Sequence, residues 1–324
     1  MNREKWIGHL AIFATAILFG LNIPIAKSLM PDYFAPTTVT SLRMVFAAVA
    51  FWITSLFLPK EKVSNKDLFF LFRASLFGVF LNQSSFIIGL STTSPIDASI
   101  IGTTAPLIVM VIAAIFLKEP ITLKKAAGVV IGLGAAIYIV YTQQHTGGEN
   151  ISSSFVGNLL CLVGSALYAV YLVMTRNISS RYSSVTLMKW MFLFAAILIL
   201  PFTWKDIITS PAFVQRAPIE EYLSLGYVLF CATYLTYMLI PVGLRRIRPT
   251  TVGMYNYLQP LVASMVAIMI GQDQFTWDKP LAGIVIFIGV YLVTVSKSKD
   301  DVEREASLKR ELKYVPLQIK NKTL

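Results

Sequence analysis

The chain has 324 residues, of which 56% are hydrophobic and 14% are charged, and its mean hydropathy is +0.66. A soluble domain carries about 25% charged residues, so this chain has too few of them to cover a surface exposed to water. The composition excludes an ordinary soluble protein and indicates a polytopic membrane protein. The net charge of +11 would suggest nucleic-acid binding in a soluble protein, but here we expect it to record membrane topology, with no nucleic-acid partner.

Apolar stretches long enough to cross about 30 Å of hydrocarbon recur along nearly the whole chain. They predict an all-α fold with ten transmembrane helices, near residues 6–29, 35–58, 68–90, 94–117, 121–141, 155–175, 184–203, 219–242, 248–270 and 280–296. The first span is not expected to be a cleavable signal, because Asn22, Pro24 and Lys27 interrupt it. A charged tail, residues 297–324, follows the last span.

The Lys and Arg residues divide unevenly between the segments that connect these spans. Of the 28, 21 fall on one side, and three fall on the other: Lys205, Arg216 and Lys279. Because basic loops resist translocation, the sequence predicts a multi-pass protein with both termini on the cytoplasmic side, in a bacterial cytoplasmic membrane. Four basic residues lie inside spans: Lys27, Arg43, Arg73 and Lys189. Arg73 is close enough to the cytoplasmic end of its helix to reach the interface.

Two halves of the chain repeat the same residues at a constant spacing. Gly89, Pro95, Pro106, Leu107, Glu119 and Thr122 are followed 154 residues later by Gly243, Pro249, Pro260, Leu261, Asp273 and Thr276. At smaller shifts, Lys27 aligns with Arg176 and Arg43 with Lys189. A repeat of five helices inserts its second copy upside down. The pattern therefore predicts two inverted five-helix repeats, residues 1–146 and 147–296, with a substrate site near the midplane between them.

The motifs of the first half resemble those of a known family. Residues 19–24 read Phe-Gly-Leu-Asn-Ile-Pro and are followed by Lys27, which is similar to the Trp-Gly-x-Asn…Lys opening of EamA-type members of the drug/metabolite transporter superfamily. Leu42-Arg43 with Ala47-Ala48 resembles its Leu-Arg…Ala pattern, and Pro106, Leu117-Lys118-Glu119 and Gly128 resemble its Pro…Leu-x-Glu…Gly signature. The resemblance covers residues 6–296 and departs from the family at Phe19, at Asp273 and in the tail. It implies the transporter fold of this superfamily.

The candidate functional residues are polar groups at membrane depth. A charge there costs about 2.5–3.5 kcal/mol, so Lys27, Arg43 and Lys189 each require a role. They could line a central cavity that attracts an anionic or zwitterionic group, or Lys27 could reach the outer interface and Arg43 could bond helix-end carbonyls. The other cavity candidates, which could equally bond across helices, are Asn22, Asn82, Gln83, Tyr168, Tyr171, Asn256, Tyr257 and Gln259.

Proline and glycine mark the positions expected to shape the helices. Pro24, Pro106 and Pro260 free backbone carbonyls and are expected to allow bends, either for gating or for packing. Gly128, Gly132 and Gly134 form a small-residue face on the fifth span. We expect this face to be scaffold, with a possible homodimer contact through Gly128 and Gly132.

The residue types that most enzymes and pumps require are scarce at depth. No Asp or Glu lies in the middle of a predicted span, and Asp97, the nearest, follows Pro95 closely enough to be a helix cap, so proton coupling is not predicted. Cys161 and Cys231 lie in apolar runs, and His9 and His145 have no ligand at metal spacing, so neither a cofactor nor a metal is expected. The Gly-Lys dipeptide of a nucleotide-binding loop does not occur in the sequence.

These observations favour a secondary transporter, an exporter or facilitator, rather than an enzyme. The expected substrate is a small metabolite, such as an amino acid or another carboxylate-bearing solute, moved by alternating access. Membrane lipids are the other expected partners. A flippase for lipids or lipid head groups on the same fold is the alternative, and a membrane-embedded enzyme is a more remote one.

Overall fold

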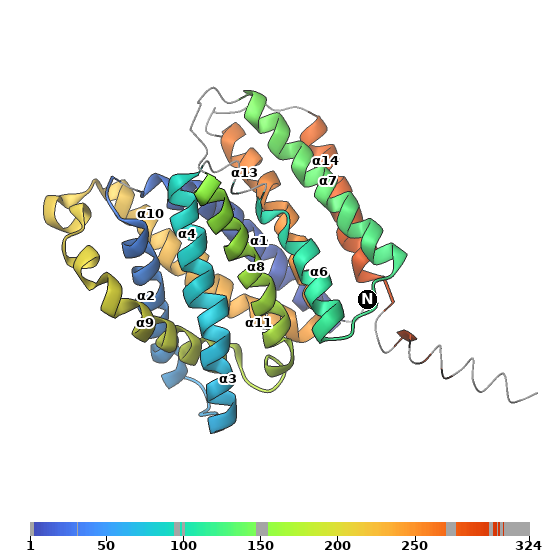
Figure 1. The fold of residues 1–324 in the computed structure, drawn as a ribbon, viewed down its shortest axis with the longest axis horizontal. Coiled ribbons are helices and arrows are strands. Elements are labelled where there is room, and N and C mark those ends of the chain that lie inside the picture. Colours follow the sequence, from blue (N-terminus) through green and yellow to red (C-terminus); the bar gives the residue numbers. More distant parts are fainter. Residues whose placement is uncertain are drawn as a thin grey trace, which may run out of the picture.

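The structure, a computed structural model, describes residues 3–30, 32–93, 98, 101–146, 155–269 and 277–297, and residues 301, 302, 304 and 307 of the tail. All regular secondary structure in these residues is helical (Figure 1), which confirms the predicted all-α class. Several residues used in the sequence analysis lie outside the described residues: Pro95, Asp97, Asp273, Thr276 and most of the tail. The side chain of His145 is also not described.

The described helices fall into two halves of the chain. The first half contains α1 (Arg3–Ser28), α2 (Pro36–Leu56), a continuous rod of α3 (Asn65–Ser75), η1 (Leu76–Leu81) and α4 (Asn82–Thr92), then α6 (Ala105–Phe116) and α7 (Leu123–Thr146). The second half contains α8 (Phe155–Ile178), α9 (Ser184–Ile208), η2 (Ala212–Arg216), a second rod of α10 (Ile219–Leu229), η3 (Phe230–Leu235) and α11 (Thr236–Arg246), then α12 (Pro249–Met254), η4 (Tyr255–Tyr257), α13 (Leu258–Met269) and α14 (Asp278–Thr294).

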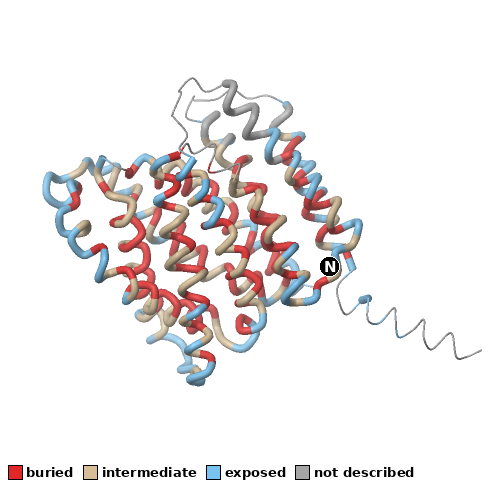
Figure 2. Tube along the Cα trace, in the orientation of Figure 1, coloured by how far each residue is buried: buried red, intermediate tan, exposed pale blue. Residues whose placement is uncertain are grey.

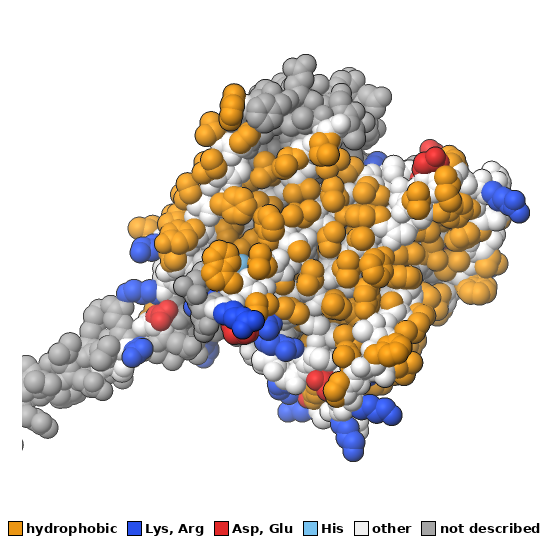
Figure 3. All heavy atoms as spheres, turned by 180° about the vertical axis from the view of Figure 1, so that it is seen from behind, with side chains coloured by type: hydrophobic (Ala, Val, Ile, Leu, Met, Phe, Trp, Pro, Cys, Tyr) orange, Lys and Arg blue, Asp and Glu red, His pale blue; other side chains and the backbone are white. Residues whose placement is uncertain are grey.

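Six helical segments of the described chain are long and apolar enough to cross a membrane: Arg3–Ser28, Pro36–Leu56, Asn65–Thr92, Phe155–Ile178, Ser184–Arg216 and Ile219–Arg246. Two shorter apolar helices are Ala105–Phe116 and Pro280–Thr294. Hydrophobic side chains cover most of the face in Figure 3, while Lys and Arg gather mainly along its lower edge. Large apolar side chains such as Phe202, 81% exposed, need lipid rather than water around them. The chain is therefore a multi-pass membrane protein.

Helix starts follow from local sequence. Pro36 and Pro249 open α2 and α12, where a missing N–H has no cost. Ser64 and Ser183 cap α3 and α9, because each hydroxyl accepts a hydrogen bond from the backbone N–H three residues later. The helices then bury their inward sides, and the buried positions run through the middle of the bundle (Figure 2).

The two rods have matching bounds. α3, η1 and α4 each begin and end 154 residues before α10, η3 and α11. Both rods contain a six-residue π-helical turn at the same place, Leu76–Leu81 and Phe230–Leu235. The spacing that the sequence repeats is thus also the spacing of these helix boundaries.

Helices of one half pack mainly against helices of the other. α2 lies against α9, α7 against α14, α4 against α8, and α1 against α11. Glycines allow the last two pairs to approach closely. A Cβ at Gly89 would lie 2.7 Å from the carbonyl oxygen of Gly157. A Cβ at Gly243 would clash with the side chain of Ile12, and it would lie 3.6 Å from the carbonyl oxygen of Gly8.

Two of the three glycines in the small-residue face of α7 are covered within the chain, whereas the third, Gly134, is exposed and an added Cβ there would meet no atom within 4 Å. A Cβ at Gly128 would lie 2.7 Å from the carbonyl oxygen of Gly289 on α14, and one at Gly132 would lie 2.6 Å from the Tyr257 ring. Both glycines therefore permit packing inside the protein and are not available to a second copy. The predicted homodimer contact through Gly128 and Gly132 is not supported, although their predicted role as scaffold is.

Candidate functional site

An open cavity lies where helices of both halves meet. Seven of the residues expected from the sequence line it: Asn22, Arg43, Asn82, Gln83, Tyr168, Asn256 and Gln259. The structure thus brings together polar residues from α1, α2, α4, α8, η4 and α13.

Eight lining residues were not among the cavity candidates expected from the sequence: Phe19, Ile23, Phe86, Ile87, Gly102, Ala105, Ser165 and Tyr237. The repeat could have found several of them. Tyr237 lies 154 residues after Gln83, and Gly102 and Ala105 lie 154 residues before Asn256 and Gln259. Apolar residues such as Ile23 and Ile87 give no such signal, because they resemble every other residue of a membrane span.

Arg43 is the cation in the cavity wall. Its side chain is held by neutral acceptors on η3: Nε donates to Thr233 Oγ1 at 2.8 Å and Nη2 to the Ala232 carbonyl oxygen at 3.3 Å. The residue is only 4% exposed. Among the ion pairs of the described residues, none neutralises Arg43. A buried charge without a counter-ion is costly in a membrane, so this site favours an anionic group in the cavity.

The π-helical turns supply carbonyl groups for contacts beyond their own helix. In η3, the Ala232 carbonyl accepts a hydrogen bond from Arg43. In η1, the Gly78 carbonyl accepts a hydrogen bond from the Tyr237 hydroxyl at 3.3 Å. Such turns are frequent at functional sites, where they reposition backbone groups.

The cavity amides are only partly satisfied. Asn82 Nδ2 donates to the Gly164 carbonyl at 2.8 Å, and Gln83 Nε2 donates to the Tyr237 hydroxyl at 3.2 Å. Gln259 Nε2 donates to Asn256 Oδ1 at 3.3 Å. Among the amide groups that line the cavity, two buried oxygens of the described residues have no hydrogen-bond partner, Asn22 Oδ1 and Gln83 Oε1. They are acceptors for N–H groups that a ligand could provide.

Four predicted cavity residues lie elsewhere, and two of them are cations. Lys27 Nζ donates to three carbonyls at the end of the first rod, those of Leu90 at 2.8 Å, Ser91 at 2.9 Å and Thr93 at 3.0 Å. It therefore satisfies the open end of a helix. Lys189 lies with Nζ 5.0 Å from the centre of the Trp52 ring, a cation–π contact.

The helix starts also change the repeat alignment of Lys189. The caps of α2 and α9, Ala35 and Ser183, are 148 residues apart. This offset pairs Arg43 with Met191 and not with Lys189. The two cations do not occupy equivalent positions, and each therefore needs its own explanation.

The other two residues outside the cavity are tyrosines in the packed core. Tyr171 is fully buried against η1, where a Cβ on Gly78 would contact its ring. Tyr257 is fully buried as well, and its hydroxyl donates to the Val129 carbonyl at 3.1 Å.

The three expected bend prolines lie at different kinds of position. Pro24 is inside α1, whereas Pro106 is the second residue of α6 and Pro260 the third of α13. Pro106 and Pro260 both follow breaks: the turn at residues 103–104 and η4. Both breaks adjoin cavity-lining residues, and discontinuous helices of this kind form substrate sites in inverted-repeat transporters. A role in gating stays a prediction.

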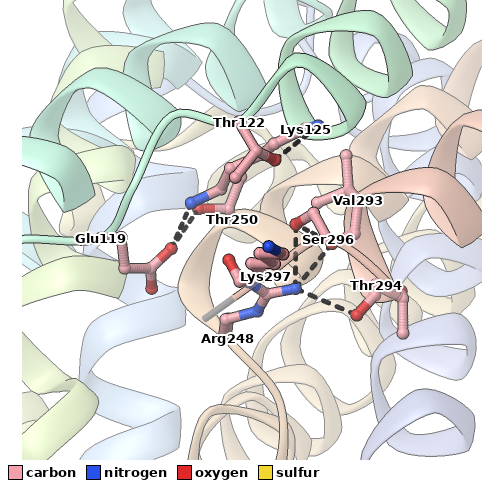
Figure 4. Close-up of polar contacts among 9 residues, drawn as sticks. All are labelled: Glu119, Thr122, Lys125, Arg248, Thr250, Val293, Thr294, Ser296 and Lys297. Carbon is pink, nitrogen blue, oxygen red and sulfur yellow. Dashed lines mark hydrogen bonds and ion pairs between the residues drawn. The ribbon is translucent and has the colours of Figure 1, made fainter. Parts of the chain in front are cut away.

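A second polar cluster lies at the opposite end of α6 and joins the two halves (Figure 4). Glu119 forms an ion pair with Lys125, which is fully buried, and accepts a hydrogen bond from Thr250 at 3.1 Å. Nearby, Arg248 Nη2 donates to the Val293 and Thr294 carbonyls at the end of α14. Within the described residues no group of three or more potential metal ligands occurs. The contacts of this cluster hold helices together.

Comparison with known proteins gives consistent results. The sequence pattern of the EamA-like transporter family matches residues 6–141 and 155–295. The chain is 21% identical over 285 residues to the uncharacterized transporter YyaM of Bacillus subtilis, covering 87% of this chain and 92% of the relative. It is 26% identical over 277 residues to a protein of Chlamydia muridarum named S-adenosylmethionine/S-adenosylhomocysteine transporter, covering 82% and 84%.

The fold is also found in a solved protein. One crystal structure superposes with a TM-score of 0.69 at 16% identity, covering 90% of this chain and 97% of that chain. The likeness at this identity concerns the fold alone.

Proposed function

Since the chain belongs to the EamA-like transporter family, as its motifs predicted, we propose that it is a secondary transporter for a small zwitterionic metabolite such as an amino acid. The substrate binds in the cavity between the two halves and crosses the membrane by alternating access. The observation that carries this proposal is Arg43, a buried cation in the cavity wall that forms no ion pair among the described residues.

Two inverted halves are part of the proposal. The family pattern matches twice along the chain, and the two rods agree in their boundaries at a shift of 154 residues. An odd number of spans per half inverts the second copy, so that the cavity between the halves can open to either side in turn. The proposed topology has five spans in each half and both termini in the cytoplasm, as the distribution of Lys and Arg favours.

The polar groups of the cavity fit both ends of an amino acid. The guanidinium of Arg43 is suited to pair with a carboxylate. Asn22 Oδ1 and Gln83 Oε1, both buried and without a donor, are suited to accept hydrogen bonds from an ammonium group. The named substrates of the Chlamydia muridarum relative also carry an α-amino acid group.

Flux into proteoliposomes tests this proposal directly. Purified protein is reconstituted, and uptake is measured for a panel of amino acids and for the amines that remain when their carboxylate is removed. We expect transport of at least one amino acid and none of the corresponding amine. Transport of both with similar KM values would contradict a role for the carboxylate.

Matched substitutions separate the cavity cation from the other deep cations. Arg43→Gln should raise the KM for the amino acid about tenfold or more, because a charge-assisted hydrogen bond is lost. Lys189→Gln is the control, since Lys189 lies over Trp52 and outside the cavity. Equal effects of the two substitutions would show that Arg43 acts through the stability of the fold and not through the substrate.

A further inference from the structure

Gly102 leaves a space in the cavity wall that no other part of the described structure fills. It lines the cavity together with Ala105, the first residue of α6, which follows the turn at residues 103–104. A Cβ built on Gly102 would meet no atom within 4 Å, in contrast to Gly20, Gly78 or Gly132, whose added Cβ atoms would lie within 3 Å of a neighbour. Close packing therefore does not explain the absence of a side chain at Gly102.

The second half of the chain has larger, polar residues at the positions that correspond to Gly102 and Ala105. The positions equivalent to Gly102 and Ala105, 154 residues later, are Asn256 and Gln259, two amide residues that line the same cavity. One wall of the cavity is therefore polar, and the wall related to it by the repeat is small and apolar. The cavity has the polar groups for one part of a ligand and room for another part.

Apolar side chains complete this second region. Phe19 and Ile23 from α1 and Phe86 and Ile87 from α4 line the same cavity, and Ile23 and Ile87 are buried. A polar substituent placed among them would lose hydrogen bonds to water without replacement, whereas an apolar one would gain from burial.

We propose that Gly102 is a specificity-determining residue, which keeps open an apolar subsite for a bulky side chain of the substrate. The inference rests on the proposed function and deepens it: the preferred substrates are amino acids with large apolar or aromatic side chains. A larger residue at position 102 fits the fold but occupies the space that the substrate needs.

The test compares size preference in the wild type and in Gly102→Leu. Proteoliposome uptake is measured for alanine, valine, leucine, phenylalanine and tryptophan, and binding is measured separately from the shift in unfolding temperature that each ligand causes. We expect the wild type to prefer the large members. In Gly102→Leu the KM for these should rise about tenfold or more, with about a twofold change at most for alanine. Gly102→Ala should fall between the two.

Gly226→Leu is the matched control. An added Cβ at Gly226 also meets no atom within 4 Å, but this glycine is exposed on α10 and outside the cavity. Its size preference should equal that of the wild type. An unchanged preference in Gly102→Leu would overturn the subsite while leaving the transporter proposal intact, and so would a failure of Gly102→Leu to fold, because the space would then not be open. A wild type that neither transports nor is stabilised by any amino acid would overturn both.

Discussion

Gln83 donates a hydrogen bond to the hydroxyl of Tyr237 at 3.2 Å, although 154 residues separate them along the chain. That separation is also the offset between the two rods, so the two residues occupy equivalent positions in the two halves. Under a two-fold relation between the halves, equivalent residues can touch only near the axis. In the proposed architecture this pair therefore marks the centre of the molecule, and both of its members line the cavity.

Removing the central hydroxyl should impair both stability and transport. In Tyr237→Phe, the Gln83 amide loses an acceptor and the Gly78 carbonyl a donor, which should lower the free energy of unfolding by about 1–3 kcal/mol. Thermal unfolding in detergent measures the first effect and proteoliposome flux the second.

Tyr234→Phe is the control for this substitution. The Tyr234 hydroxyl bonds Thr54 Oγ1 at 2.7 Å, and Tyr234 does not line the cavity. We expect a similar loss of stability with an unchanged KM. If the substrate KM moved equally in both variants, the central pair would have no special role in binding.

Gly78→Ala should destabilise the protein because its Cβ has no room. The added atom would overlap the ring of Tyr171, which is fully buried, and neither side can yield easily. Overpacking of this kind costs about 1–3 kcal/mol or more. Combining Gly78→Ala with Tyr171→Leu should recover part of the loss, a coupling that a double-mutant cycle in thermal unfolding would detect. Additive losses in the double variant would mean that Gly78 is required for another reason, such as the π-helical turn itself.

The sequence could predict the fold class and part of the site for a physical reason. Apolar spans, and the rare polar residues inside them, can be recognised from a short stretch of the sequence alone. Arg43, Asn82 and Gln83 stood out for this reason. Lys27 stood out equally, yet its partners are three carbonyls at the C-terminal end of α4, which only the tertiary arrangement supplies. Depth alone cannot distinguish a cation that faces a cavity from one that caps a neighbouring helix.

The sequence could not identify residues whose role depends on the empty space beside them rather than on the chemistry of their own side chains. Gly102 is one glycine among many in the sequence, and only the empty space beside it distinguishes it from the packed Gly132. The predicted dimer contact at Gly128 is not supported for a related reason. A row of small residues in the sequence does not show which helix packs against it. In this protein that helix is α14.

The stability of the loop between α2 and α3 should depend on pH through Glu61. Its carboxylate accepts hydrogen bonds from the backbone N–H and the hydroxyl of Ser183, the residue that caps α9. Burial alone would raise the pKa of Glu61, but hydrogen bonds from Thr186 and Ser183 and the charge of Arg245 outweigh it and lower the pKa below 4.5.

A lowered pKa means that ionised Glu61 stabilises the folded state above the unfolded pKa, and that this contribution is lost as the pH falls through the folded pKa. The unfolding temperature of the wild type should therefore exceed that of Glu61→Gln at neutral pH, and the difference should shrink below about pH 4. A constant difference across the acid range would contradict this assignment.

Glu119→Gln should be among the most damaging single substitutions outside the cavity. Lys125 is fully buried and Glu119 is 8% exposed, so loss of the carboxylate leaves a buried ammonium without its counter-ion. Breaking such a pair costs about 3–5 kcal/mol, whereas replacing both partners with neutral residues costs much less. Unfolding in detergent should accordingly show Glu119→Gln/Lys125→Met to be more stable than Glu119→Gln alone.

Glu4→Gln is the matched control, because it also removes a carboxylate from an ion pair, with Arg246 at 2.9 Å, but Glu4 is 61% exposed. Water and salt screen such a pair, so its loss should cost less than about 1 kcal/mol. Equal costs for the two substitutions would show that Lys125 is hydrated or finds another acceptor when Glu119 is neutral.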